Sequence, residues 1–243
     1  AAMSIASTSS RAALCALALL VACGGGKRRT APDDLGLPAL DHTWTVDELT
    51  AAATIIDDTC TRAPAQLPPW GSTAFTRLVD GGNRATLPTT PIDARQAALT
   101  RYTAATLSLY STYLRCGRPA ETLAANAALL EGYAEALAVG VAMRDAAAEG
   151  TPERAQRQHG LDTMADGLTG GVTSTVNMLL DPTIPGHLPP EVTGRLGAAI
   201  AAVRSELPPG ALDDVIAPLA RAAGAETDPD RRQALAAAAA ALH

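Results

Sequence analysis

Apolar side chains recur at alternating steps of three and four residues along most of the chain after residue 44. This spacing places them on one face of an α-helix. The clearest stripe comprises Val46, Leu49, Ala53, Ile56 and Cys60. The pattern predicts four long helices, one from about Val46 to before Pro64 and others over 93–116, 120–148 and 152–180. Shorter helices are predicted over 72–79, 190–207, 211–223 and from 229 onward.

Local signals mark where these helices begin and end. Asp93 and Thr151 are suitable N-caps for the second and fourth long helices, and Gly117 with Pro119 ends the second. Residues 63–93 hold five prolines and form a long crossover connection. Within the fourth long helix, three glycines at 167, 170 and 171 predict either a close helix approach or a kink. Pro218 is expected to kink or split the helix over 211–223.

The composition supports an all-α fold. Alanine, the best helix former, is abundant, whereas aromatic residues make up only 3% of the chain. The expected architecture is a helical bundle of about four long helices plus shorter C-terminal helices, braced by one disulfide. A formal net charge of −6 argues against nucleic acid as a partner, because phosphate binding needs clustered Lys and Arg. The shortage of aromatic side chains mildly disfavours a large organic ligand.

The first residues have the three parts of an export signal: a polar start ending at Arg11, an apolar run over 12–22, and small residues before Cys23. The apolar run is shorter than the about 20 residues of a membrane-spanning helix. Residues 3–30, and the sequence Leu-Val-Ala-Cys-Gly over 20–24 above all, resemble the signal peptide and lipobox of bacterial lipoproteins. No family is recognised for the rest of the chain.

The lipoprotein resemblance implies that residues 1–22 are removed and that Cys23 carries a covalent diacylglycerol, with no other cofactor expected. Residues 23–43 would then be a flexible tether and 44–243 a single helical domain. The implied location is the exported side of a cell-envelope membrane, and Gly24 in place of Asp favours the outer membrane if the cell has one. The alternative is an ordinary secretory signal with a chance cysteine.

Two cysteines remain once Cys23 is lipidated and Cys15 is removed with the leader. Cys60 and Cys116 each fall in the last turn of a predicted helix and on its apolar side. An even pair in an oxidising compartment predicts a disulfide. The bond would place the first two long helices side by side and parallel, as the long connection over 63–93 allows. Two free buried thiols are the alternative.

No zinc, haem, nucleotide or α/β-hydrolase motif occurs in the chain. The best candidate cluster is His159, Asp162 and Asp166, which share one side of the fourth helix and could hold a metal or act in acid–base chemistry. A solvated charged edge is the simpler interpretation. Trp70, in the long connection, either plugs the loop onto the bundle or contacts a partner.

These observations favour a lipid-anchored, non-enzymatic binding or scaffolding module of the bacterial cell envelope, held at the membrane by its lipid and able to bind another envelope protein. One alternative is a metal-binding protein or hydrolase-like enzyme that uses His159, Asp162 and Asp166. The other is a small-ligand carrier with a pocket near Trp70, Tyr102 and Tyr113.

Overall fold

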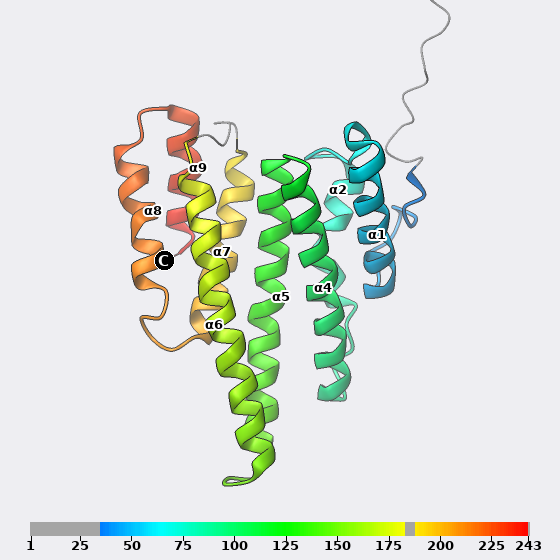
Figure 1. The fold of residues 1–243 in the computed structure, drawn as a ribbon, viewed down its shortest axis with the longest axis vertical. Helices are drawn as coiled ribbons and strands as arrows, with labels where there is room; N and C mark the ends of the chain where they lie inside the picture. Colours follow the sequence, from blue (N-terminus) through cyan, green and yellow to red (C-terminus); the bar gives the residue numbers. More distant parts are fainter. Residues whose placement is uncertain (1–34, 183–187, 243) are drawn as a thin grey trace, which may run out of the picture. The chain divides into compact units, whose positions relative to one another are not determined.

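The computed structural model describes residues 35–182 and 188–242, and throughout these ranges the regular structure is helical, with no strand (Figure 1). The elements are α1 (Val46–Arg62), η2 (Pro64–Gln66), α2 (Thr73–Leu78), α3 (Gly82–Ala85), α4 (Ile92–Arg115), α5 (Pro119–Ala146), α6 (Pro152–Leu180), α7 (Pro190–Glu206), α8 (Asp213–Ala225) and α9 (Pro229–Ala240). The expected all-α class is confirmed. The predictions for the leader and Cys23 lie outside the described residues.

Helix α5 packs against three neighbours, α4, α6 and α7 (Figure 1). Every residue from Glu121 to Leu130 is buried, so this half of α5 has no solvent face. Four of these ten side chains are alanine, whose small size lets helices approach α5 closely. Although α5 is 28 residues long, neither it nor any other helix among the described residues is long and apolar enough to cross a membrane.

Helices α1 and α4 lie side by side and parallel, as the sequence predicted. A disulfide joins Cys60 to Cys116 at their carboxyl ends, with a Cα–Cα distance of 6.1 Å. Near the same ends, Asp57 accepts a hydrogen bond of 2.7 Å from the Thr112 hydroxyl. Towards the amino end of α1, Asp47 pairs with Arg101. The partners therefore advance in the same direction along both helices.

The crossover between α1 and α4 is ordered by short helical turns. Ser72 caps α2 by accepting a hydrogen bond from the Phe75 amide, close to the predicted start of this helix. The buried side chains of Leu67, Phe75 and Leu78 hold the segment against the core. The single turn α3 was not predicted, because Asp80-Gly81-Gly82-Asn83 is typical of a helix end.

One local prediction was wrong, and of the two outcomes predicted for Pro218 one is excluded. Asp93 is not the N-cap of α4: the extended backbone of Pro91 begins the helix, and Asp93 lies in its first turn, where a carboxylate favours the helix dipole. Pro218 does not split its helix, since α8 runs unbroken from Asp213 to Ala225. Pro218 lies in the second turn of α8, so the carbonyl that it leaves without a donor belongs to the first turn.

Three glycines allow helices to approach closely. A Cβ on Gly132 would lie 2.8 Å from the Tyr102 ring, and one on Gly140 would lie 2.8 Å from Leu161. The tightest site is Gly197 in α7, where a Cβ would lie 2.2 Å from the carbonyl oxygen of Ala238 in α9. Backbone atoms cannot move aside as a flexible side chain can, so α7 and α9 require glycine at this crossing.

We expect Gly197→Ala to destabilise the protein by about 1–3 kcal/mol, because the added methyl group forces α7 away from α9. Gly194→Ala, one turn earlier, is the matched control. Its Cβ would lie 3.9 Å from that of Ala237, an ordinary contact. The control should leave stability unchanged or raise it by up to about 1 kcal/mol through helix propensity. Urea unfolding followed by circular dichroism measures both, and equal stabilities would contradict the predicted clash.

Removing the disulfide should also destabilise the fold. Because Cys60 and Cys116 are 56 residues apart, Cys60→Ser/Cys116→Ser should lose about 4 kcal/mol in the chain-entropy description of the unfolded state. Reductant should lower the stability of the wild type and leave the double variant unchanged in urea unfolding. Alkylation of both sulfurs without prior reduction, seen by intact mass, would show that the bond does not form.

Candidate binding site

The three polar residues singled out from the sequence, His159, Asp162 and Asp166, lie on α6 and are all exposed. Asp162 accepts a hydrogen bond of 2.7 Å from the Gln158 amide. No three His, Cys, Asp or Glu side chains in the described part of the chain are grouped so that they could hold a metal ion. The geometry is that of a solvated helix edge and offers no cleft for a substrate.

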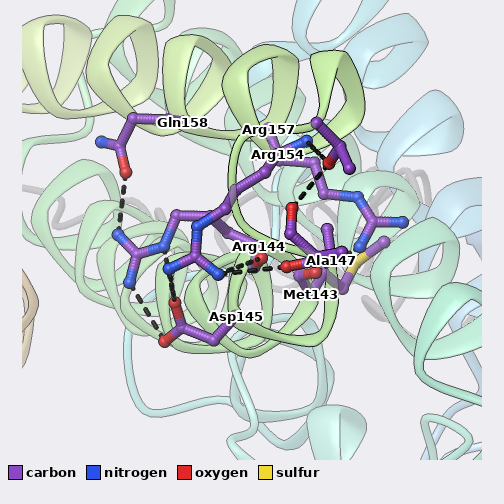
Figure 2. A network of polar contacts seen from close by, with 9 residues as sticks. Met143, Arg144, Asp145, Ala147, Arg154, Arg157 and Gln158 are labelled. Carbon is purple, nitrogen blue, oxygen red and sulfur yellow. Dashed lines mark hydrogen bonds and ion pairs between the residues drawn. The ribbon is translucent and has the colours of Figure 1, made fainter.

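Gln158 connects this edge to a clamp at the turn between α5 and α6 (Figure 2). Arg144, in the last turn of α5, donates to Gln158 and to the neighbouring Asp145. Arg154 donates to the carbonyl oxygens of Arg144 and Ala147, and Arg157 donates to that of Met143. These carbonyls lie at the end of α5, where helix acceptors have no partner in a following turn, although that of Arg144 also accepts from the Ala147 amide. The clamp therefore fastens the helix end.

A second polar network, not predicted from the sequence, surrounds Glu131 of α5. Its carboxylate accepts two hydrogen bonds of 2.8 Å from Arg195 of α7 and one of 2.9 Å from Arg84 of α3. The neighbouring Glu135 pairs with Arg84 and with Arg95 of α4. Burial opposes the charged form of Arg195, but the hydrogen bonds and charge of Glu131 outweigh it and raise the pKa of Arg195. The network ties four helices together.

We expect Glu131→Gln to destabilise the protein by about 2 kcal/mol, because it leaves the Arg195 and Arg84 guanidinium groups without their shared carboxylate. The side chains of Glu131 and Arg195 are 17% and 30% exposed, so the cost is below the about 3–5 kcal/mol of a fully buried pair. Glu153→Gln, which breaks an exposed pair with Arg157 on α6, should cost at most about 0.5 kcal/mol. Thermal and urea unfolding compare the two variants. Equal losses of stability would contradict the larger contribution of the Glu131 network.

Trp70 is fastened to the bundle but not buried. Its backbone amide donates a hydrogen bond of 2.8 Å to Glu121, and its ring meets the edge of Phe75 with centroids 5.8 Å apart. Phe75 in turn packs on Tyr113, which is fully buried. These contacts hold the connection between α1 and α4 against the bundle, while 39% of the Trp70 surface stays exposed. A partner contact at Trp70 stays a prediction.

A hollow of about 410 Å³ lies among α4, α5 and α6. Helices α4 and α6 both pack on α5 but hardly on each other, so the hollow has α5 as its floor and the other two helices as walls. Its main apolar and aromatic lining residues are Leu107, Tyr110, Leu130, Tyr133, Met164 and Leu168. This volume lies within the about 300–1,000 Å³ of small-molecule sites.

The two ends of the hollow differ in the side chains that line them. At one end, the Asn126 amide donates a hydrogen bond of 2.5 Å to the hydroxyl of Thr175, and both side chains are almost fully buried. At the other end lie Tyr133 and Met164. Because α5 and α6 are antiparallel neighbours joined by a short turn, residues 126 and 175 share one end and residues 133 and 164 the other. Tyr110 also lines the hollow, and burial raises the pKa of its hydroxyl.

The position of the hollow differs from the predicted carrier pocket. Tyr102 and Tyr113 are buried core side chains, and the tyrosines that line the hollow are Tyr110 and Tyr133. A signal for it is present in the sequence: Gly167, Gly171 and Ser174 follow one another at steps of four and three on α6. Small residues at helical spacing leave space beside a helix. The predicted close approach at Gly167, Gly170 and Gly171 is not observed, since a Cβ at each would meet no atom within 4 Å.

The fold and the hollow define a disulfide-braced, all-α protein with an apolar and aromatic hollow among α4, α5 and α6. Comparison of the chain with protein-family models, curated proteins and solved structures found no match.

Proposed function

We propose that this chain is an exported binding module of a bacterial cell envelope, anchored to a membrane through a diacylglycerol on Cys23. Its helical domain binds a partner or ligand and does not catalyse a reaction. The observation that carries the binding role is the hollow among α4, α5 and α6, with its apolar and aromatic lining. The proposed location rests on the Leu-Val-Ala-Cys sequence that ends at Cys23.

The disulfide is consistent with this location. Disulfides persist in exported compartments and are rare where thiols are kept reduced. Two or more acyl chains anchor a protein stably, whereas one chain binds only marginally. A protein held in this way presents its helical domain beside the membrane, and the outer membrane is favoured if the cell has one.

A metal-binding or hydrolytic role based on His159, Asp162 and Asp166 gains no support from their exposed positions on α6. The carrier interpretation is favoured by the same observation as the binding module, the volume and lining of the hollow. The two proposals differ only in whether the bound species is a macromolecule or a small amphiphile.

Lipidation is tested by growing a bacterial host that expresses the full chain with an alkyne-tagged fatty acid. The wild type should take up the label, sediment with membranes and start at Cys23 by mass spectrometry. Cys23→Ser should lose the label and keep its leader. Cys15→Ser is the matched control, because residue 15 lies in the part of the leader that is removed, and this variant should behave as the wild type does.

Label retained by Cys23→Ser, or a mature amino terminus at another residue, would contradict the lipid anchor. Loss of the label in both variants would show instead that the leader tolerates no change, and the mass of the wild-type amino terminus then decides between the two interpretations.

A further inference from the structure

The hollow among α4, α5 and α6 is narrower than a helix. Its lining on α6 runs from Met164 to Thr175, about 16 Å along the axis at 1.5 Å per residue. Three turns of an α-helix about 10 Å across would displace about 1,300 Å³, which is more than the about 890 Å³ of empty space in the hollow. A helix can therefore rest only over its mouth, whereas an extended hydrocarbon chain can enter it.

The lining is neutral. None of the described residues that line the hollow carries a charged side chain. Burying an ion there would remove its hydration with no opposite charge to replace it, and such burial is strongly unfavourable. The occupant is therefore uncharged over the part that enters.

One end of the hollow offers hydrogen bonds. The Asn126 side chain has two donors and a carbonyl acceptor, and its bond to Thr175 uses only one of the donors. The Ser174 hydroxyl lies at the same end; it donates to the Gly170 carbonyl and so offers an acceptor. The opposite end, at Tyr133 and Met164, is lined by ring and thioether surface. The polar and apolar ends match the two ends of an amphiphile.

Glycines keep the space open. Gly167 and Gly171 line the hollow, and a Cβ at either would meet no atom within 4 Å. Each glycine costs about 1 kcal/mol relative to alanine inside a helix. Since no neighbouring atom requires glycine at these positions, a larger side chain at either would reduce the volume of the hollow.

We propose that the hollow binds a neutral amphiphile with a single hydrocarbon chain, placing the chain towards Met164 and Tyr133 and the polar group at Asn126 and Thr175. This inference rests on the proposed binding role and names the ligand class of that site. It does not depend on the lipid anchor, since the anchor is tested by labelling and the hollow by binding to an unlipidated chain.

The test uses residues 32–243, which form one compact unit and lack both the apolar run over 12–22 and Cys23. They are purified without detergent, because a detergent has the chemistry of the proposed ligand. The probe is 1-monolauroylglycerol, added as monomers and followed by native mass spectrometry. One molecule should bind per chain. Laurate has the same chain with a carboxylate, and it should bind at least about tenfold more weakly, because the lining offers no cation. Equal affinities for 1-monolauroylglycerol and laurate would overturn the inference that the polar group of the ligand is uncharged.

Methyl NMR of the methionines locates the bound molecule. The Met164 methyl signal should shift on addition of 1-monolauroylglycerol, because this side chain lines the hollow. Met143, at the carboxyl end of α5, should not shift. A shift of Met143 alone would place binding elsewhere and overturn the assignment.

Gly171→Leu should fill the hollow and weaken binding about tenfold or more, since each methylene displaced removes several-fold in affinity. Gly170→Leu is the matched control, because it also replaces a helical glycine with open space around it but lies outside the lining. Both variants should be at least as stable as the parent. Binding that is equal in the two variants, or no binding to the parent chain, would overturn the proposal.

A second copy of the chain is the competing occupant. Light scattering after gel filtration should find a monomer with and without 1-monolauroylglycerol. A dimer that dissociates in Gly171→Leu but not in Gly170→Leu would show that the hollow is the interface between two copies of the chain. This result would overturn the proposal that it binds an amphiphile.

Discussion

The burial of α5 on all sides is the constraint on which the rest of the structure depends. From Glu121 to Leu130 every side chain is buried, so α4, α6 and α7 must each cover part of one helix. Alanine makes this possible, because a helix surface of methyl groups lets its neighbours approach without side chains interleaving deeply. The arrangement places most of the packing energy in contacts between small groups, which are individually weak and collectively large.

The same constraint creates the hollow. Three helices can surround α5, but its neighbours α4 and α6 diverge enough to pack hardly at all on each other. Where the wall of α6 carries Gly167 and Gly171, nothing fills the gap between them. Leu107 on the facing wall is left 43% exposed as a consequence. On the side of α5 that faces α7, by contrast, Glu131 and its arginines place charged groups between the helices.

Sequence periodicity predicted the class and the long helices, because these depend on local spacing. The disulfide was predicted from the two cysteines that remain after Cys15 and Cys23 are set aside, and from their places at the helix ends. The stripe from Val46 to Cys60 is buried as expected, and the cysteines at the helix ends meet. Periodicity could not predict that α5 is buried all round, because alanine is read as a helix former whether it faces solvent or core. It also missed the network around Glu131, whose partners Arg84 and Arg195 come from elements far apart in the chain.

The glycines show why the site was harder to predict than the fold. Gly132, Gly140 and Gly197 stand where a methyl group would collide with a neighbour, so packing alone accounts for them. Gly167 and Gly171 have no such neighbour and still interrupt a helix at a cost of about 1 kcal/mol each. In the sequence both kinds are glycines inside a helical pattern, and the spacing of small residues on α6 only hints at the difference. Only the positions of the facing helices separate a glycine required by contact from one that preserves a cavity, and those positions follow from the burial of α5.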